Sequence, residues 1–158
     1  MRSFLRFLLL ASLVVGCGLS ENLDGGVSRA ETDRTLRGYS SRVFDGLALH
    51  GRHGDADDIH PTSCEFQSAT ESSNLQVVTH FWQIDDLPVV EIGAAVDRLR
   101  KYLLLQKWQI LDFAAPPEVD NTLIRAKNPE DDYVIWVKAI GEMNRVIVRV
   151  SSPCVRLS

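Results

Sequence analysis

The sequence predicts one α+β domain, in which helices cover one face of an antiparallel sheet of about five strands. Two segments, 30–49 and 89–107, carry apolar residues at helical spacing. After Trp108 the pattern changes to an alternation of apolar and polar residues in four short segments. A run of strands that follows a helix, without further alternation of the two, favours an antiparallel sheet with the helices on one side.

The first helix is expected over residues 30–49. Two glycines, Gly38 and Gly46, each weaken a helix by up to about 1 kcal/mol relative to alanine. The following residues, 50–63, are rich in glycine, aspartate and histidine and are expected to form a loop. The apolar face of the helix is formed by Leu36, Tyr39, Val43 and Leu47.

Residues 75–84 are dominated by β-branched and aromatic side chains and are predicted to form a strand. Pro88 then suits the first turn of a helix, because proline has no N–H to leave unpaired there. The helix over 89–107 follows, and its charged residues lie largely off the apolar stripe. That stripe consists of Ile92, Val96, Leu99 and Leu103.

Four strands are predicted after this helix. In the last of them, three valines alternate with Arg145, Ile147 and Arg149. Such an alternation is typical of a sheet with one covered and one exposed face. The four segments are 109–114, 122–127, 133–140 and 145–150.

The N-terminus has the features of a secretory signal peptide. Arg2 and Arg6 precede an apolar run over 7–15, and Gly16 stands directly before Cys17. The pattern resembles the lipobox of bacterial lipoproteins, which implies cleavage before Cys17 and diacylation of its thiol. The apolar run is shorter than the roughly 20 residues that a transmembrane helix needs. The lipid is therefore the expected membrane contact.

This pattern divides the chain into three parts. Residues 1–16 are the expected signal peptide, and residues 17–29 are the lipid anchor with a flexible, glycine-containing tether. Residues 30–158 form the α+β domain, which is long enough for one hydrophobic core. The expected location is the extracytoplasmic face of the cell membrane.

Two cysteines remain once Cys17 carries lipid. An even pair in an oxidising compartment predicts a disulfide between Cys64 and Cys154. The bridge would close a loop of about 90 residues and contribute roughly 4–5 kcal/mol, mainly by restricting the unfolded chain. Two free buried thiols are the alternative interpretation.

Taken together, residues 17–158 resemble small actinobacterial-type exported lipoproteins of unknown function. The resemblance depends on short motifs at four places in the chain. It implies a lipid-anchored extracytoplasmic α+β domain and supplies no catalytic residues. The motifs are the lipobox at Cys17, Thr62-Ser63-Cys64 before the first strand, Lys107-Trp108 at the end of the long helix, and the C-terminal Ser152-Pro153-Cys154.

One segment contains candidate metal ligands. Residues 50–60 hold three histidines and three aspartates, and imidazole and carboxylate groups bind zinc and other transition metals. The spacing matches no known metal motif, so a solvated polar loop is the competing interpretation. The candidate ligands are His50, His53, Asp55 and His60.

Aromatic and basic side chains offer candidate binding surfaces. Arg145 and Arg149 share one face of the last strand, where they would either be solvated or meet an anionic partner. The aromatic residues are expected to fill the core, with a ligand groove as the alternative. They are Phe81, Trp82, Trp108, Phe113, Tyr133 and Trp136.

The functional expectation is a non-enzymatic binding or interaction module at the cell envelope. No nucleophile motif and no phosphate-binding loop is present, and no cofactor beyond the covalent lipid is expected. A net charge of −4 argues against a nucleic-acid partner. A metal-binding protein that uses the segment 50–60 is the second hypothesis. An enzyme whose site is assembled from distant residues is the third.

Overall fold

A computed structural model of the chain describes residues 26–64, 75–114 and 122–158. Within these residues the fold is α+β, with two α-helices and one seven-stranded sheet in which every strand pairing is antiparallel. The elements are α1 (Arg29–Leu47), β1 (Arg52–Ser63), β2 (Leu75–Asp85), α2 (Val89–Leu105), β3 (Gln109–Ala114), β4 (Leu123–Lys127), β5 (Val134–Ile140), β6 (Arg145–Ser151) and β7 (Val155–Arg156).

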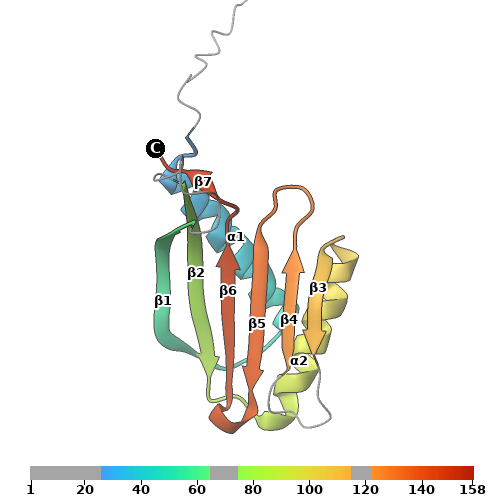
Figure 1. Cartoon of the computed structure of the whole chain (residues 1–158). Coiled ribbons are helices and arrows are strands. Elements are labelled where there is room, and N and C mark those ends of the chain that lie inside the picture. Colours follow the sequence, from blue (N-terminus) through green and yellow to red (C-terminus); the bar gives the residue numbers. More distant parts are fainter. Residues whose placement is uncertain (1–25, 65–74, 115–121) are drawn as a thin grey trace, which may run out of the picture.

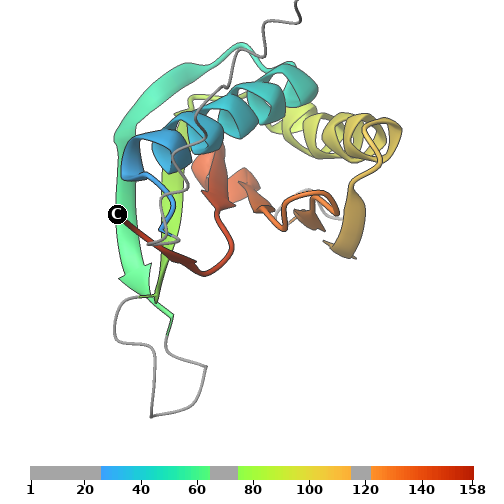
Figure 2. The ribbon, with the colours of Figure 1, turned by 90° about the horizontal axis from the view of Figure 1, so that it is seen from above.

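The strands lie in the order β1-β2-β6-β5-β4-β3, and the short β7 pairs with the first residues of β2 (Figure 1). Strands β3 to β6 form a meander of consecutive neighbours. The last of these strands returns to lie beside β2, at the centre of the sheet. Both helices lie on the same side of the sheet (Figure 2). Neither of these two described helices lies on the opposite face, which we call the open face.

The hydrophobic core lies between the two helices and the covered face of the sheet. In β5 and β6 every second side chain is buried, as the period of an extended strand requires. Fully burying a leucine or isoleucine side chain contributes roughly 1.5–3 kcal/mol, so this layer is a main source of stability. The fully buried residues of the helices include Leu36, Leu47, Ile92 and Leu99.

The predicted α+β class, both helices, and the strands after Trp108 are present, with ends within a few residues of those expected. The predicted number of about five strands is too low, because the sheet has seven. One addition is β7, which has only two residues. It is too short to produce a periodic sequence signal.

The other addition corrects the predicted loop over residues 50–63, most of which forms β1. This strand lies at the edge of the sheet and gains its backbone hydrogen bonds from β2. Its polar composition is compatible with a strand because the side chains at 57–63 are exposed, apart from the partly buried Ile59. Charged residues also protect such an edge from pairing with other chains. The pairing register shifts between His53 and Asp57.

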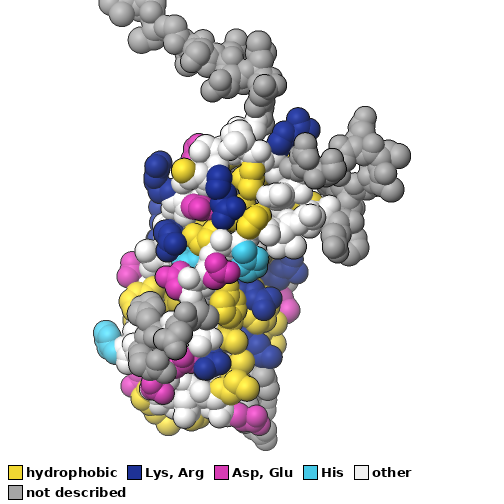
Figure 3. Space-filling view, turned by 90° about the vertical axis from the view of Figure 1, so that its left-hand side faces the viewer, with side chains coloured by type: hydrophobic (Ala, Val, Ile, Leu, Met, Phe, Trp, Pro, Cys, Tyr) yellow, Lys and Arg dark blue, Asp and Glu magenta, His cyan; other side chains and the backbone are white. Residues whose placement is uncertain are grey.

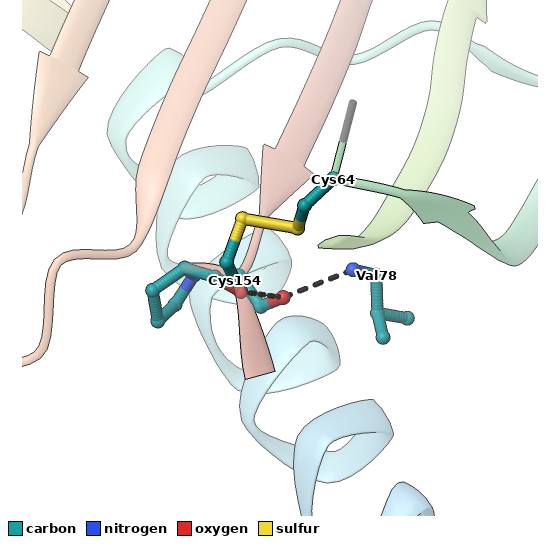
Figure 4. Close-up of a disulfide and its surroundings, with 5 residues drawn as sticks. Cys64, Val78 and Cys154 are labelled. Carbon is teal, nitrogen blue, oxygen red and sulfur yellow. Dashed lines mark hydrogen bonds between the residues drawn. A yellow bond between two sulfur atoms is a disulfide. The ribbon is translucent and has the colours of Figure 1, made fainter. Parts of the chain in front are cut away.

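The predicted disulfide is present and joins Cys64, directly after β1, to Cys154, between β6 and β7 (Figure 4). The two Cα atoms are 6.3 Å apart. Beside the bridge, the backbone N–H of Val78 donates to Ser152 Oγ at 2.9 Å. The hairpin of β1 and β2 and the C-terminal segment are thereby fixed to each other.

The signal segment 1–16, Cys17 and most of the tether 17–29 fall outside the residues that the structure describes. Among the helices it does describe, none combines the length and the apolar character needed to cross a membrane.

Candidate functional site

A cleft of about 370 Å³ lies between α1 and the first two strands. Helix α1 contributes Arg37, Ser40 and Phe44 to its wall, β1 contributes Asp57, and β2 contributes His80 and Trp82. Figure 3 faces the β1 side of the molecule, where hydrophobic side chains adjoin acidic, basic and histidine side chains. Polar and aromatic groups therefore meet in one small volume.

Local geometry explains why these residues converge. Arg37, Ser40 and Phe44 are three and four positions apart, which places them on one face of α1. In β2, His80 and Trp82 are two positions apart and share the covered face of the sheet. Asp57 of β1 lies directly opposite Trp82 and therefore shares that face.

A chain of hydrogen bonds runs through the buried imidazole of His80. Its Nδ1 lies 2.7 Å from Ser40 Oγ, and its Nε2 lies 2.7 Å from Asp57 Oδ1. The carboxylate of Asp57 can only accept, so Nε2 donates to it, and in the neutral ring Nδ1 accepts the hydroxyl proton of Ser40. Both Ser40 and His80 are only 5% exposed. The chain thus satisfies two buried polar side chains and ends at an accessible carboxylate.

Charges at the mouth of the cleft partly balance one another. The guanidinium Nη1 of Arg37 lies 3.7 Å from Asp57 Oδ1, and both side chains are 59% exposed. An ion pair this exposed contributes at most about 1 kcal/mol. The guanidinium can therefore turn toward an incoming ligand at little cost.

Another part of the cleft wall is aromatic and adjoins Ser41 and Asp45 of α1. The rings of Phe44 and Trp82 have centroids 6.1 Å apart and are inclined at 58°. Phe44 is half-buried, whereas Trp82 is 5% exposed and belongs to the hydrophobic core. An apolar group that enters the cleft would contact Phe44, which the buried ring of Trp82 supports from behind.

The order of the bonded groups, serine to histidine to aspartate, matches that of a serine-hydrolase triad, but two features differ. The two ring nitrogens are exchanged, because in the triad Nε2 faces the serine and Nδ1 faces the aspartate. Ser40 also lies in the interior of α1, where backbone N–H groups bond to carbonyls four residues earlier. These N–H groups cannot form an oxyanion hole beside Ser40. The arrangement therefore suits binding better than acyl transfer.

A second polar cluster fixes α1 to the turn between β4 and β5. The hydroxyl of Tyr39 donates to Asp131 Oδ2 at 2.5 Å and accepts from Asn128 Nδ2 at 2.6 Å. Burial, followed by the hydrogen bond to the Asp131 carboxylate, raises the pKa of Tyr39 from 10.0 to about 12. Both effects favour the neutral phenol. This cluster is structural, since the Tyr39 ring also packs edge-on against Trp108.

The structure places His53, Asp55 and His60 of the predicted metal ligands on β1 and His50 just before it. Positions 53 and 60 both belong to β1, and a strand rises about 3.3 Å per residue, so their backbones are roughly 20 Å apart. The side chains of His53 and Asp55 lie outside the description. His60 Nδ1 is 3.2 Å from Asp58 Oδ2. No cluster of three or more metal-ligating side chains occurs among the described residues, and metal binding by His50, His53, Asp55 and His60 stays a prediction.

The predicted aromatic and basic candidates divide between the two faces of the sheet. Trp82, Trp108 and Tyr133 are buried in the core, and Phe113 packs against it. Phe81 and Trp136 lie on the open face, where Arg149 is close to both rings. Arg145 lies on the same face and forms an ion pair with Asp85.

Sequence reasoning missed the convergence of Ser40, Asp57 and His80. The three residues belong to different elements, and no local motif connects them. The useful signal would have been the register of β1 against β2, since Asp57 lies opposite Trp82. That register was hidden because the polar composition of residues 50–63 indicates a loop.

No protein family model matches the chain, and no curated protein or solved structure shows significant similarity to it. The function is therefore inferred from the geometry of the molecule itself.

Proposed function

We propose that this protein is a lipid-anchored extracytoplasmic binding module that acts without catalysis. The sequence around Cys17 supports the anchor, since a positive segment and a short apolar run precede a cysteine. The disulfide between Cys64 and Cys154 supports an extracytoplasmic location, because such bonds persist in oxidising compartments. The anchor holds the domain at the membrane surface, where its cleft meets envelope components.

One observation carries the binding function: the cleft joins the hydrogen-bond chain of Ser40, His80 and Asp57 to an aromatic wall. Ligand sites commonly combine an apolar surface with a few oriented polar groups. We infer a small ligand that places a ring or short apolar chain against Phe44 and a hydrogen-bonding group toward Arg37 and Asp57. Because His80 is fixed on both sides, this polar end of the cleft is preorganised.

Two-dimensional amide NMR of the mature chain tests this function with a panel of small aryl alcohols, amines and carboxylates. We expect the amide shifts caused by binding fragments to cluster at residues 37–45 and 80–82. Phe44→Ala should weaken the binding of these fragments. The matched control is Leu105→Ala, at an exposed apolar residue of α2, which should leave their binding unchanged. Shifts scattered over the surface, or none from any fragment, would remove the basis for the cleft as a binding site.

The absence of catalysis is tested separately with p-nitrophenyl acetate and a fluorophosphonate that labels activated serines. The wild-type chain and Ser40→Ala should release nitrophenol at the same slow rate, and neither should be labelled. Labelling of Ser40, together with turnover that Ser40→Ala abolishes, would replace the binding hypothesis with a hydrolase.

A further inference from the structure

The open face of the sheet concentrates positive charge in an acidic protein. The chain has a net charge of −4, yet β4, β5 and β6 together contain five basic residues and no aspartate or glutamate. The buried positions of these strands are all apolar and face the helices. The basic residues occupy the alternate positions and therefore share the open face. We call them the cationic strip: Arg125, Lys127, Lys138, Arg145 and Arg149.

Two members of the cationic strip are already neutralised. Arg145 pairs with Asp85, and Lys127 Nζ lies 2.7 Å from Asp132 Oδ1. Within the described part of the chain, no salt bridge engages Arg125, Lys138 or Arg149. These three side chains hold the positive charge that is available to a partner.

Arg149 is flanked by two aromatic neighbours on the adjacent strands. Its guanidinium carbon lies 5.6 Å from the centroid of Phe81 and 5.0 Å from that of Trp136. The strand register explains this, because both residues lie directly opposite Arg149 on the adjacent strands. A planar guanidinium between two rings loses less side-chain entropy when it binds an oxyanion through its N–H groups. Arg149 is thus the preorganised centre of the strip.

Phe81, Arg149 and Trp136 form one row across the strands, because they lie opposite one another. This row continues towards both edges of the sheet and ends in a carboxylate on each side. Arg125 lies opposite Trp136, and Asp112 of β3 lies opposite Arg125. On the other side, Asp58 of β1 lies opposite Phe81. Because strands are about 4.8 Å apart, the positive region is only roughly 10 Å wide between β4 and β6. Arg125 and Arg149 flank β5 in this row, and Lys138 lies one row further along β5.

The shape of this region selects among anionic partners. A flat anionic membrane would also bring negative headgroups against Asp58 and Asp112. A single linear polyanion that runs along β5 passes between Arg125 and Arg149, reaches Lys138 and avoids both carboxylates. Trp136 is half-buried on this face, and such a ring offers a packing surface for the C–H groups of a sugar ring.

We propose that the cationic strip binds a linear acidic polysaccharide, with its carboxylate or phosphate groups on Arg149, Arg125 and Lys138. The strip and the cleft lie on opposite faces of the sheet. This inference is therefore independent of the proposed cleft ligand, and either can fail alone.

The experiment measures binding of the mature chain with Cys17→Ser, which removes the lipid, to polygalacturonate at low salt. Neutral dextran, poly-L-glutamate and phosphatidylglycerol vesicles serve as the comparison probes. We expect polygalacturonate to bind best and dextran not to bind. The affinity should fall severalfold when NaCl is raised to about 0.5 M, because salt at this concentration screens exposed charges.

Two triple variants, each of which removes three positive charges, distinguish binding by the cationic strip from an effect of the net charge. Arg125→Gln/Lys138→Gln/Arg149→Gln should weaken polygalacturonate binding about tenfold or more, as expected for three lost exposed ion pairs. Arg34→Gln/Lys101→Gln/Lys107→Gln, on and after the helices of the other face, should leave it unchanged. Arg149→Lys should lose part of the affinity, since it keeps the charge but not the planar group.

Three results would overturn the proposal: no measurable binding of polygalacturonate, equal loss in both triple variants, or equal or tighter binding of poly-L-glutamate or of the vesicles. Circular dichroism of each variant ensures that a loss of binding does not come from unfolding. Because the replaced side chains are on the open face, the variants are expected to fold.

Discussion

His80 Nε2 lies 2.7 Å from Asp57 Oδ1, although the two residues are 23 positions apart and Asp57 belongs to a segment without a strand-like pattern. The bond connects the core of the sheet to its polar edge strand. It also orients the imidazole so that the other ring nitrogen lies within hydrogen-bond distance of Ser40 Oγ. The cleft thus obtains its fixed polar end from the pairing of β1 with β2.

The stability of the protein should depend on His80 far more than on Asp57. His80→Ala removes a buried ring and leaves the Ser40 hydroxyl without its acceptor, so the free energy of unfolding should fall by about 2–4 kcal/mol. Asp57→Asn should cost less than about 1 kcal/mol, because that side chain is 59% exposed. Urea denaturation followed by circular dichroism measures both. Equal effects of the two changes would contradict this account of the site.

The two glycines of α1 should respond in opposite ways to alanine. A Cβ at Gly38 meets nothing within 4 Å, so Gly38→Ala should stabilise the protein by roughly 0.5–1 kcal/mol through helix propensity. A Cβ at Gly46 would lie 2.9 Å from atoms of Leu99 and Tyr102, where the two helices approach closely. Gly46→Ala should therefore destabilise it, typically by about 1–3 kcal/mol. Thermal unfolding of the pair provides the comparison, and stabilisation by both would show that α1 and α2 do not pack as described.

Tyr39 should make the stability of the fold depend on pH in the alkaline range. Burial and the hydrogen bond to Asp131 raise its pKa in the folded state to about 12, above the ordinary 10.0. A raised pKa favours the protonated phenol, so this contribution is complete below pH 10 and is lost as the pH rises through 12. The free energy of unfolding should decline more steeply between pH 10 and 12 in the wild type than in Tyr39→Phe.

An absorbance titration of the phenolates checks the same residue directly. The chain has three tyrosines, and the phase near pH 12 should shrink in Tyr39→Phe. Burial also raises the pKa of Tyr133, so a late phase of smaller amplitude should remain. A titration unchanged by Tyr39→Phe would show that Tyr39 is not held by Asp131.

The anchor at Cys17 predicts a defined mature mass. Intact-mass spectrometry of protein from native membranes, without reductant, should show a chain that begins at Cys17, carries a diacylglyceryl group and lacks two hydrogens. Cys17→Ser should abolish the lipid and release the domain from the membrane. Membrane partition of that variant with normal processing would contradict lipid anchoring.

The disulfide should stabilise the domain chiefly through the unfolded chain. Replacing Cys64 and Cys154 together by alanine is expected to cost roughly 2–5 kcal/mol, because the closed loop is long. Chemical denaturation under oxidising conditions measures the loss. Reductant should lower the stability of the wild type by a similar amount and leave that of the double variant unchanged. If reductant destabilises both proteins equally, the loss of stability does not come from the disulfide.

Much of the architecture follows from local patterns in the sequence. The stripe of α2, from Ile92 to Leu103, and the alternation in β6 each come from one element burying one side, so periodicity reveals them. The pairing of Cys64 with Cys154 followed from composition alone, since only two cysteines remain after Cys17. Strand β1 could not be predicted in this way, because its hydrogen bonds come from β2 and its side chains need no apolar pattern at an exposed edge.

The sequence alone determined the fold class, the principal elements, the predicted signal at Cys17 and the pairing of the two remaining cysteines. Only the tertiary structure decided which distant residues meet. The register of β2 between β1 and β6 brings Asp57 to His80 on one face and Phe81 to Arg149 on the other. Local sequence encodes which side of an element is buried, but contacts between elements depend on strand order and register, which are set when the whole core packs together.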